Sequence, residues 1–206
     1  LDGTLLDTAP DMAGAINALR TEQSLDPLPY ATVREQVSHG AAALVRVAFP
    51  HAPEADFHAL RDRFLALYRR RLADETRPFP GISQLLDALE RARVAWGVVT
   101  NKPAWLAEPL LEALGLRHRA VTVVSGDTLP EKKPHPRPLL VAAERAQAAP
   151  HDCIYVGDAE RDVVAGRAAG MRTLVACFGY IGRMEDARAW PADGWIDSPL
   201  DVLPWI

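Results

Sequence analysis

The 206-residue sequence has few cysteines and no excess of positive charge. Its two cysteines, Cys153 and Cys177, are too few for a disulfide scaffold or a cysteine-ligated zinc site. With 23 Lys and Arg against 27 Asp and Glu, the net charge is −4, which argues against nucleic acid or an anionic membrane as main partner. No apolar run approaches the roughly 18 residues of a membrane helix. These absences favour a reduced, cytoplasmic protein of enzyme size.

The composition is that of an ordinary folded domain. Apolar residues make up 49% of the chain and charged residues 24%, close to the average for globular proteins. This length suits one domain, or one domain that carries a modest insertion. Because there is neither an internal repeat nor a low-complexity segment, we do not expect a repeat architecture or disorder.

The first third of the chain predicts helices. Met12 and Ile16 follow helical spacing, and Thr8 is in a suitable place to cap the first helix. A second helical stretch is expected to break near Gly40. The three stretches span 9–24, 32–49 and 54–74. No convincing strand lies between 9 and 78, so this block is interpreted as a small helical unit.

After residue 78, short apolar runs rich in β-branched residues alternate with helical patterns. The runs predict buried strands at 94–100, 121–125, 153–157 and 173–177. Helices are expected over 82–92, 104–114, 137–147 and 160–169. Such alternation indicates a parallel sheet of βαβ units. The predicted fold is therefore α/β, a doubly wound parallel sheet, with a core of 1–10 and 78–206 and a helical insertion at 11–77.

Two expectations concern the ends of the sequence. The segment LDGTLL, residues 1–6, is similar to the end of a strand whose beginning lies before Leu1, so we expect the sequence to be part of a slightly longer chain. The tail, 180–206, is rich in Trp and Pro and is expected to pack back on the sheet.

The helical insertion follows the first strand directly. It would therefore lie as a lid over the carboxyl edge of the sheet, where ligands bind.

Four polar clusters stand at or just after the predicted strand ends. Each alone has an ordinary structural explanation as a turn, a helix start or a solvated charge. Their order along the chain makes them expected to meet at one sheet edge, where they supply carboxylates, a hydroxyl, an amide and a cation. That set of groups suits phosphoryl transfer. The clusters are Asp2-Gly3-Thr4, Thr100-Asn101, Lys132-Lys133-Pro134 and Gly157-Asp158 with Asp162.

The order of these motifs resembles that of the haloacid dehalogenase superfamily, whose pattern is Asp-x-Asp-Gly-Thr, Ser/Thr, Lys and Gly-Asp-x-x-x-Asp. The resemblance covers essentially the whole chain and implies a Rossmann-like core with an inserted α-helical cap. The corresponding runs are LDGTLLDT, GVVTNKP, KKPHPRPL and YVGDAERD. Within the superfamily, VVTNKP, KKPHPRPLL and the tail are most similar to bacterial phosphoglycolate phosphatases and the related N-acetylmuramic acid 6-phosphate phosphatases.

The resemblance also implies catalytic roles. The family's nucleophilic aspartate falls directly before Leu1, outside this sequence, and would form an aspartyl-phosphate intermediate. Asp2 would be the general acid/base. Thr4 would steady the nucleophile loop. The Thr100 hydroxyl and Asn101 amide would bind the phosphoryl oxygens, and Lys133 would neutralise the charge of nucleophile and phosphate.

A metal ion follows from the same resemblance. The backbone carbonyl of Asp2 and the carboxylate of Asp158 would bind Mg²⁺. Asp162 would assist, either as a further ligand or by holding the groups that contact the ion. Mg²⁺ is the only cofactor expected. The expected ligand is a small phosphorylated metabolite, with no nucleic acid or membrane as partner and with the chain a monomer or homodimer.

Other reactions of this superfamily fit less well. A dehalogenase usually lacks an acid at the position of Asp2. The phosphonate hydrolases and sugar phosphomutases use a lysine of the cap, whereas no lysine lies between 11 and 77. A dinucleotide-binding domain would need a glycine-rich turn after the first strand. A non-catalytic, phosphate-sensing module remains the alternative of another class.

Substrate choice is expected to depend on the cap. Ser38-His39-Gly40 is either a loop that points into the site or a plain turn, and Arg46 is either a partner for a substrate carboxylate or a solvated charge. Arg69-Arg70-Arg71 is interpreted as surface charge at a helix end. Two substrates compete, 2-phosphoglycolate and N-acetylmuramic acid 6-phosphate. Both carry a carboxylate.

Overall fold

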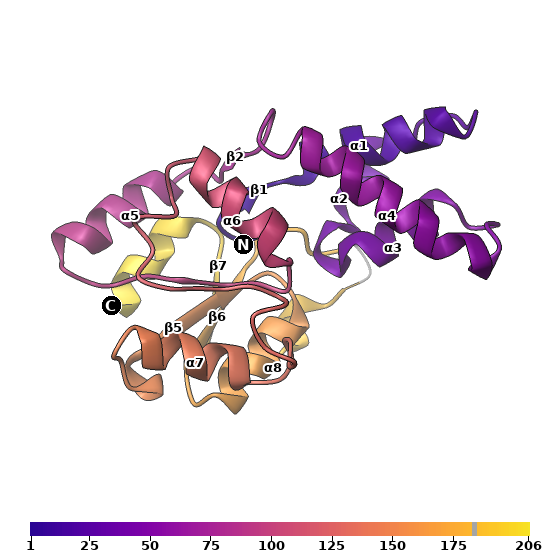
Figure 1. Ribbon diagram of the computed structural model, residues 1–206. Helices are drawn as coiled ribbons and strands as arrows, with labels where there is room; N and C mark the ends of the chain where they lie inside the picture. The colour runs from indigo at the N-terminus through magenta and orange to yellow at the C-terminus, as the bar shows by residue number, and fades with distance from the viewer. Residues whose placement is uncertain (183–184) are drawn as a thin grey trace.

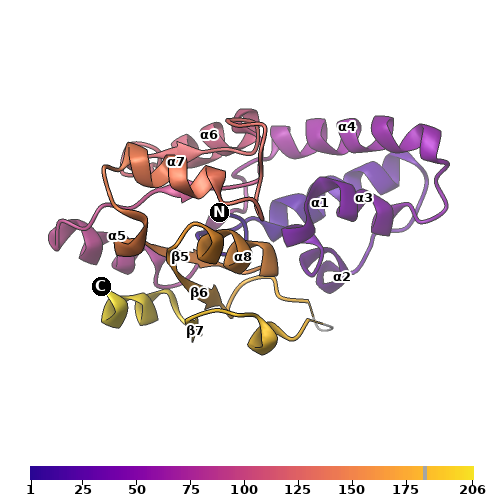
Figure 2. The ribbon, with the colours of Figure 1, turned by 90° about the horizontal axis from the view of Figure 1, so that it is seen from below.

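The computed structural model describes residues 1–182 and 185–206. Helices from the first third of the chain gather on one side of an α/β part, and two views at right angles show the same separation (Figures 1 and 2). The first residues of the chain lie between the two parts, and the C-terminus lies at the far end of the α/β part, beside α5 (Figure 1). Within the described ranges, no helix is long and apolar enough to cross a membrane.

The helical unit follows the predicted periodicity closely. The second predicted stretch divides into two helices with a 3₁₀ turn, Val37–His39, between them. The break falls at Gly40 as predicted, where the backbone adopts a positive φ of 83°. Thr8 does precede the first helix, but its hydroxyl caps nothing and donates to Asp2 instead. The helices are α1 (Ala9–Glu22), α2 (Tyr30–Arg34), α3 (Gly40–Ala48) and α4 (Glu54–Arg70).

The α/β part confirms the predicted fold class, with shorter strands than expected. The strands are β1 (Leu6–Asp7), β2 (Arg77–Pro78), β3 (Val98–Val99), β4 (Val123–Val124), β5 (Ile154–Gly157), β6 (Arg172–Ala176) and β7 (Gly194–Ile196). The helices are α5 (Ile82–Arg91), α6 (Ala104–Ala113), α7 (Arg137–Arg145) and α8 (Glu160–Ala168). Gly115 and Gly170, both at positive φ, follow the ends of α6 and α8.

The strands pair in three groups. β1 pairs antiparallel with β2, β3 pairs parallel with β4, and β5, β6 and β7 form a parallel three-stranded sheet in that order. Residues 1–5 contain only an isolated bridge, between Asp2 and Leu6. The tail does pack back on the sheet as predicted, but it does so as the edge strand β7 followed by the 3₁₀ segment Pro199–Trp205. The parallel pairs bring the ends of β3 and β5 toward the helical unit.

A continuous apolar core joins the two parts. Leu6 after the first turn, Ile16 of α1 and Phe64 of α4 are almost fully buried in the same cluster as residues of α5 and α6. Polar contacts reinforce the junction, because the buried carboxylate of Asp11 in α1 accepts hydrogen bonds from the backbone and hydroxyl of Thr76 at 2.8 and 2.7 Å. The chain therefore returns from the helical unit to the α/β part along a fixed path.

Candidate active site

A cavity of about 390 Å³ lies between the helical unit and the α/β part, and it collects the predicted site residues. Thr4, Lys133 and Asp158 line it from the α/β part, while Ser38 and Tyr68 reach it from the helical unit. The remaining predicted residues, Asp2, Thr100, Asn101 and Asp162, line it too. The structure thus brings together all seven side chains that sequence motifs singled out.

Asp2 is held by a hydroxyl and an ammonium. Its Oδ1 accepts hydrogen bonds from Thr8 Oγ1 at 2.8 Å and from Lys102 Nζ at 2.9 Å. Burial opposes ionisation of this carboxyl, but the charge and hydrogen bond of Lys102 outweigh burial and hold the pKa of Asp2 below its ordinary value. The carboxylate is therefore fixed in one orientation.

Lys102 is a site residue that the sequence reasoning missed. Its ammonium is buried, pairs with Asp2 and also donates to the Tyr68 hydroxyl at 3.0 Å, with the Tyr68 ring 4.6 Å away. Tyr68 belongs to α4, so this contact links the α/β part to the helical unit. The available signal was the run Thr100-Asn101-Lys102, in which the lysine follows two motif residues directly.

Lys133 occupies the centre of a second buried pair. Its Nζ lies 2.8 Å from Asp162 Oδ1 and donates to Tyr155 Oη at 2.7 Å and to the Val99 carbonyl at 3.0 Å. Burial would lower the pKa of Lys133, yet the adjacent carboxylate raises it above its ordinary value. Burial would conversely raise the pKa of Asp162, and Lys133 lowers it. The charged form of the Lys133 side chain is therefore favoured over the neutral amine.

The turn after β3 positions the predicted phosphate-binding groups. Thr100 is buried, and its hydroxyl accepts a hydrogen bond from the Lys102 amide at 3.1 Å. The Asn101 side chain accepts from the Lys133 amide and donates to the Lys133 carbonyl, at 3.1 and 3.0 Å. A Cβ at Gly126 would lie 2.1 Å from the Asn101 carbonyl, so only glycine permits this approach. These hydrogen bonds hold the turn after β3 against the backbone of Lys133.

Asp158 is a buried carboxylate in the turn between β5 and α8. It accepts hydrogen bonds from Thr4 Oγ1 at 3.1 Å, Ser38 Oγ at 2.5 Å and the Tyr180 amide at 3.1 Å. Burial and the neighbouring Asp162 raise its pKa above the ordinary value. Across 1–182 and 185–206, no lysine or arginine pairs with it. The site thus holds a negative charge that a bound cation would stabilise.

The backbone approaches Asp158 closely at Gly3. Gly3 has a φ of +76°, and a Cβ there would lie 2.0 Å from Asp158 Oδ2. Only glycine satisfies both conditions. The Asp-Gly-Thr motif therefore has a structural reason in this chain, since the glycine lets Asp2 and Thr4 approach the carboxylate of the turn after β5.

Donors for a metal ion are present but incomplete. In the described part of the chain, no group of three or more His, Cys, Asp and Glu side chains is arranged to hold a metal. The donor pair is Asp158 and Asp162, and both oxygens of Asp162 already face protein groups, Lys133 and the Ala159 amide. Asp158 therefore suits the role of a direct metal ligand, whereas Asp162 suits the role of holding Lys133 in place.

The sequence left two interpretations of Ser38-His39-Gly40 open, and the structure supports the one in which the segment points into the site, because Ser38 lines the cavity and donates to Asp158. Arg46 does not reach the cavity; it is exposed, pairs with Glu54 at 3.3 Å and covers the Phe57 ring, which supports its interpretation as a solvated charge over that of a partner for a substrate carboxylate. The interpretation of the Arg69–Arg71 run as surface charge fails for Arg71, which contacts the buried Asp11.

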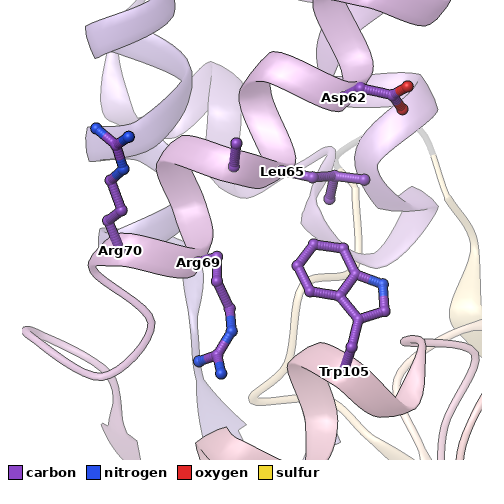
Figure 3. A pocket seen from close by; sticks show the side chains of 6 residues that line it. Asp62, Leu65, Arg69, Arg70 and Trp105 are labelled. Carbon is purple, nitrogen blue, oxygen red and sulfur yellow. The ribbon is translucent and has the colours of Figure 1, made fainter.

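A second cavity, of about 430 Å³, lies between α4 and the start of α6. Figure 3 shows Leu65 and Trp105 facing one another there, flanked by Asp62, Arg69 and Arg70. None of the motif residues lines it. It lacks the buried carboxylates and the buried lysines of the first cavity, so the chemistry belongs to the first cavity.

Comparison with known proteins decides the family. The family model described as haloacid dehalogenase-like hydrolase matches residues 1–176. The chain belongs to this family. A protein from Xanthomonas campestris named phosphoglycolate phosphatase is 45% identical over 97% of this chain and 90% of its own length. One from Pseudomonas putida, named N-acetylmuramic acid 6-phosphate phosphatase, is 40% identical over 98% of this chain and 91% of its own.

A solved structure shares the fold of this haloacid dehalogenase-like hydrolase. It is a predicted phosphoglycolate phosphatase from Haemophilus somnus, 29% identical, with a TM-score of 0.88 over 100% of this chain and 94% of that chain. A second, from Lactobacillus plantarum, is 22% identical with a TM-score of 0.83 and supports the fold alone. Together these relatives confirm the predicted superfamily and the enzyme class.

Proposed function

We propose that this protein is a Mg²⁺-dependent phosphomonoester hydrolase whose substrate is 2-phosphoglycolate. The observation that carries the proposal is the single cavity in which Thr100, Asn101 and Lys133 face Asp2 and Asp158. Relatives 43–45% identical over nearly the whole chain bear the name phosphoglycolate phosphatase. The ligand is thus a small phosphorylated metabolite.

The residues of this chain divide the reaction between them. Thr100 and Asn101 bind the phosphoryl oxygens, and Lys133, charged throughout, offsets the repulsion between the phosphate and an attacking carboxylate. In the haloacid dehalogenase-like family the nucleophile is an aspartate, and the aspartyl phosphate that it would form divides hydrolysis into two easier steps. Asp2 is ionised beside Lys102, so it must first take up a proton from solvent, which it then gives to the leaving oxygen; ionised again, it takes a proton from the attacking water.

Mg²⁺ suits the charge of this site. Asp158 is buried, its pKa is raised, and it has no cationic partner in the ranges 1–182 and 185–206, so a hard cation with oxygen ligands would stabilise it. Asp158 and the Asp2 carbonyl would hold the ion, with Asp162 supporting the site through Lys133. When bound, the ion supplies charge stabilisation to the transferring phosphoryl group.

The helical unit, residues 11–77, serves as the cap in this proposal, over a core of 1–10 and 78–206. Ser38 donates to Asp158, and the Tyr68 hydroxyl accepts from Lys102, so two contacts from the unit reach catalytic groups. A cap held in this way excludes water from the cavity while the phosphoryl group is transferred.

N-acetylmuramic acid 6-phosphate is the second candidate substrate. It is favoured by the relatives of that name, 40% identical over 98% of this chain. The Xanthomonas campestris relatives named phosphoglycolate phosphatase are more similar to this chain, at 45% identity over 97% of its length. Phosphoglycolate is therefore placed first.

The test is hydrolysis by a chain that also carries the residues expected before Leu1. kcat/KM is measured with Mg²⁺ on 2-phosphoglycolate and N-acetylmuramic acid 6-phosphate in parallel. We expect a preference of about a hundredfold for phosphoglycolate, equal to about 2.7 kcal/mol of transition-state binding. The reverse preference would assign the sugar phosphate. Mg²⁺ binding without turnover of any phosphomonoester would leave the phosphate-sensing module.

A further inference from the structure

Two cations of the active-site cavity, Lys132 and Arg161, form no ion pair within hydrogen-bonding distance among the described residues. The two other cationic side chains from the α/β part are already neutralised, since Lys102 pairs with Asp2 and Lys133 pairs with Asp162. Lys132 is exposed, so water solvates its charge. Arg161 is half-buried and lies against the helical unit.

The position of Arg161 is unusual for a cation. It is the second residue of α8, where the helix dipole favours acidic side chains, and Glu160 and Asp162 on either side follow that rule. A guanidinium has five N–H donors, yet the one hydrogen bond of Arg161 in the described part of the chain goes to the Ser38 carbonyl, at 2.5 Å, while its charge also acts on the neighbouring Asp162. Most of its hydrogen-bonding fork is therefore left without a protein acceptor.

Ser38 places this guanidinium close to the reacting groups. The Ser38 carbonyl accepts from Arg161, and the Ser38 hydroxyl donates to Asp158 at 2.5 Å. One residue thus separates the arginine from the carboxylate expected to bind the metal. In a substrate whose second anionic group is only a few atoms from its phosphate, that group would contact Arg161 while the phosphate is bound in the site.

We propose that Arg161 binds the carboxylate of the substrate through its free N–H groups, at the seam between the α/β part and the helical unit. Planar carboxylates suit the guanidinium fork, and a charge-assisted pair in a half-buried site is stronger than one in water. This proposal rests on the proposed function and adds the residue that selects a carboxylate-bearing phosphomonoester. It gives Arg161 the role that the sequence suggested for Arg46.

The experiment compares 2-phosphoglycolate with ethyl phosphate, which has a methyl group in place of the carboxylate. The variants are Arg161→Met and, as a matched control on the same helix whose guanidinium likewise donates to a backbone carbonyl but lies outside the cavity, Arg167→Met. We expect Arg161→Met to lower kcat/KM for phosphoglycolate by about 10- to 150-fold. For ethyl phosphate the change should stay below about threefold, and Arg167→Met should change either value by less than about threefold.

The outcomes separate the two proposals. If the unsubstituted protein does not prefer phosphoglycolate to ethyl phosphate, the proposed function is wrong and the role of Arg161 is lost with it. If that preference holds but Arg161→Met slows both substrates equally, Arg161 only holds the Ser38 carbonyl and the inference is overturned. If Arg161→Met does not fold, Arg161→Lys keeps the charge, and a loss confined to phosphoglycolate is again required.

Discussion

Replacing Asp158 by Asn is expected to lower kcat/KM for the phosphomonoester by about a thousandfold. The carboxylate is the one acidic side chain of the cavity that has no lysine or arginine partner within the described ranges, so it is the group a metal cation would use. Loss of a metal's charge stabilisation costs several kcal/mol in the transition state, and each 1.36 kcal/mol is tenfold in rate. The measurement is kcat/KM across a Mg²⁺ titration.

The same substitution should change stability in the opposite direction. Because burial and Asp162 raise the pKa of Asp158, the folded state binds its proton more tightly than the unfolded state. Ionisation of Asp158 therefore opposes folding, and metal-free protein loses stability as pH rises from the ordinary carboxyl pKa through the raised one. Asp158→Asn removes that loss, so metal-free variant and parent should differ most at neutral pH, with the variant at least as stable.

Mg²⁺ itself provides the discriminating readout. At 100 times its Kd, a ligand that binds only the folded state adds about 2.7 kcal/mol to the free energy of unfolding. We expect the Tm of the unsubstituted protein to rise with Mg²⁺, the Tm of Asp158→Asn to stay constant, and the exposed control Asp152→Asn to behave like the parent. A variant that kept its Mg²⁺-dependent rise in Tm would show that Asp158 is not the metal ligand.

Replacing Asp2 by Asn is expected to lower kcat for an alkyl phosphomonoester by about 10²- to 10⁴-fold, the usual contribution of a general acid/base. The variant keeps the backbone carbonyl, so the dependence of kcat on Mg²⁺ should remain. The amide can still accept from Lys102 and Thr8, which limits the structural change.

The leaving group supplies the internal control for Asp2→Asn. Nitrophenolate departs without a proton, so p-nitrophenyl phosphate should lose much less in the first chemical step than 2-phosphoglycolate does. Single-turnover kinetics isolates that step. Equal losses for both substrates in that step would contradict proton donation by Asp2 and assign it a purely structural role, through Lys102 and Tyr68.

The sequence predicted the elements and the motif residues well, for a topological reason. Parallel strands joined by helices bring their carboxyl ends to one edge, so Thr100 after β3 and Asp158 after β5 were expected to meet. The contacts of the helical unit were not readable in this way. Ser38 and Asp158 are 120 residues apart, and Lys102 and Tyr68 are 34 apart, so their pairing depends on how the unit docks rather than on any local pattern.

Charge alone does not distinguish two arginines of this chain. Arg46 and Arg161 look alike in the sequence, each within or beside a helical pattern. In the folded protein, Arg46 pairs with Glu54 on the surface, whereas Arg161 lines the cavity between the helical unit and the α/β part. The strand β7 was missed because Gly194–Ile196 is three residues long and takes its stability from pairing with β6. Three residues are too few to show the alternation of apolar and polar side chains that predicts a strand.

The most direct test of the account is to look for the covalent intermediate. The protein with the residues expected before Leu1 is mixed with Mg²⁺ and 2-phosphoglycolate radiolabelled in phosphate, quenched in acid within one turnover and digested. The account predicts transient label on the peptide that contains Asp2 and Thr4, and its release by hydroxylamine as expected of an acyl phosphate. Release of labelled phosphate with no label on the protein at any time would contradict it.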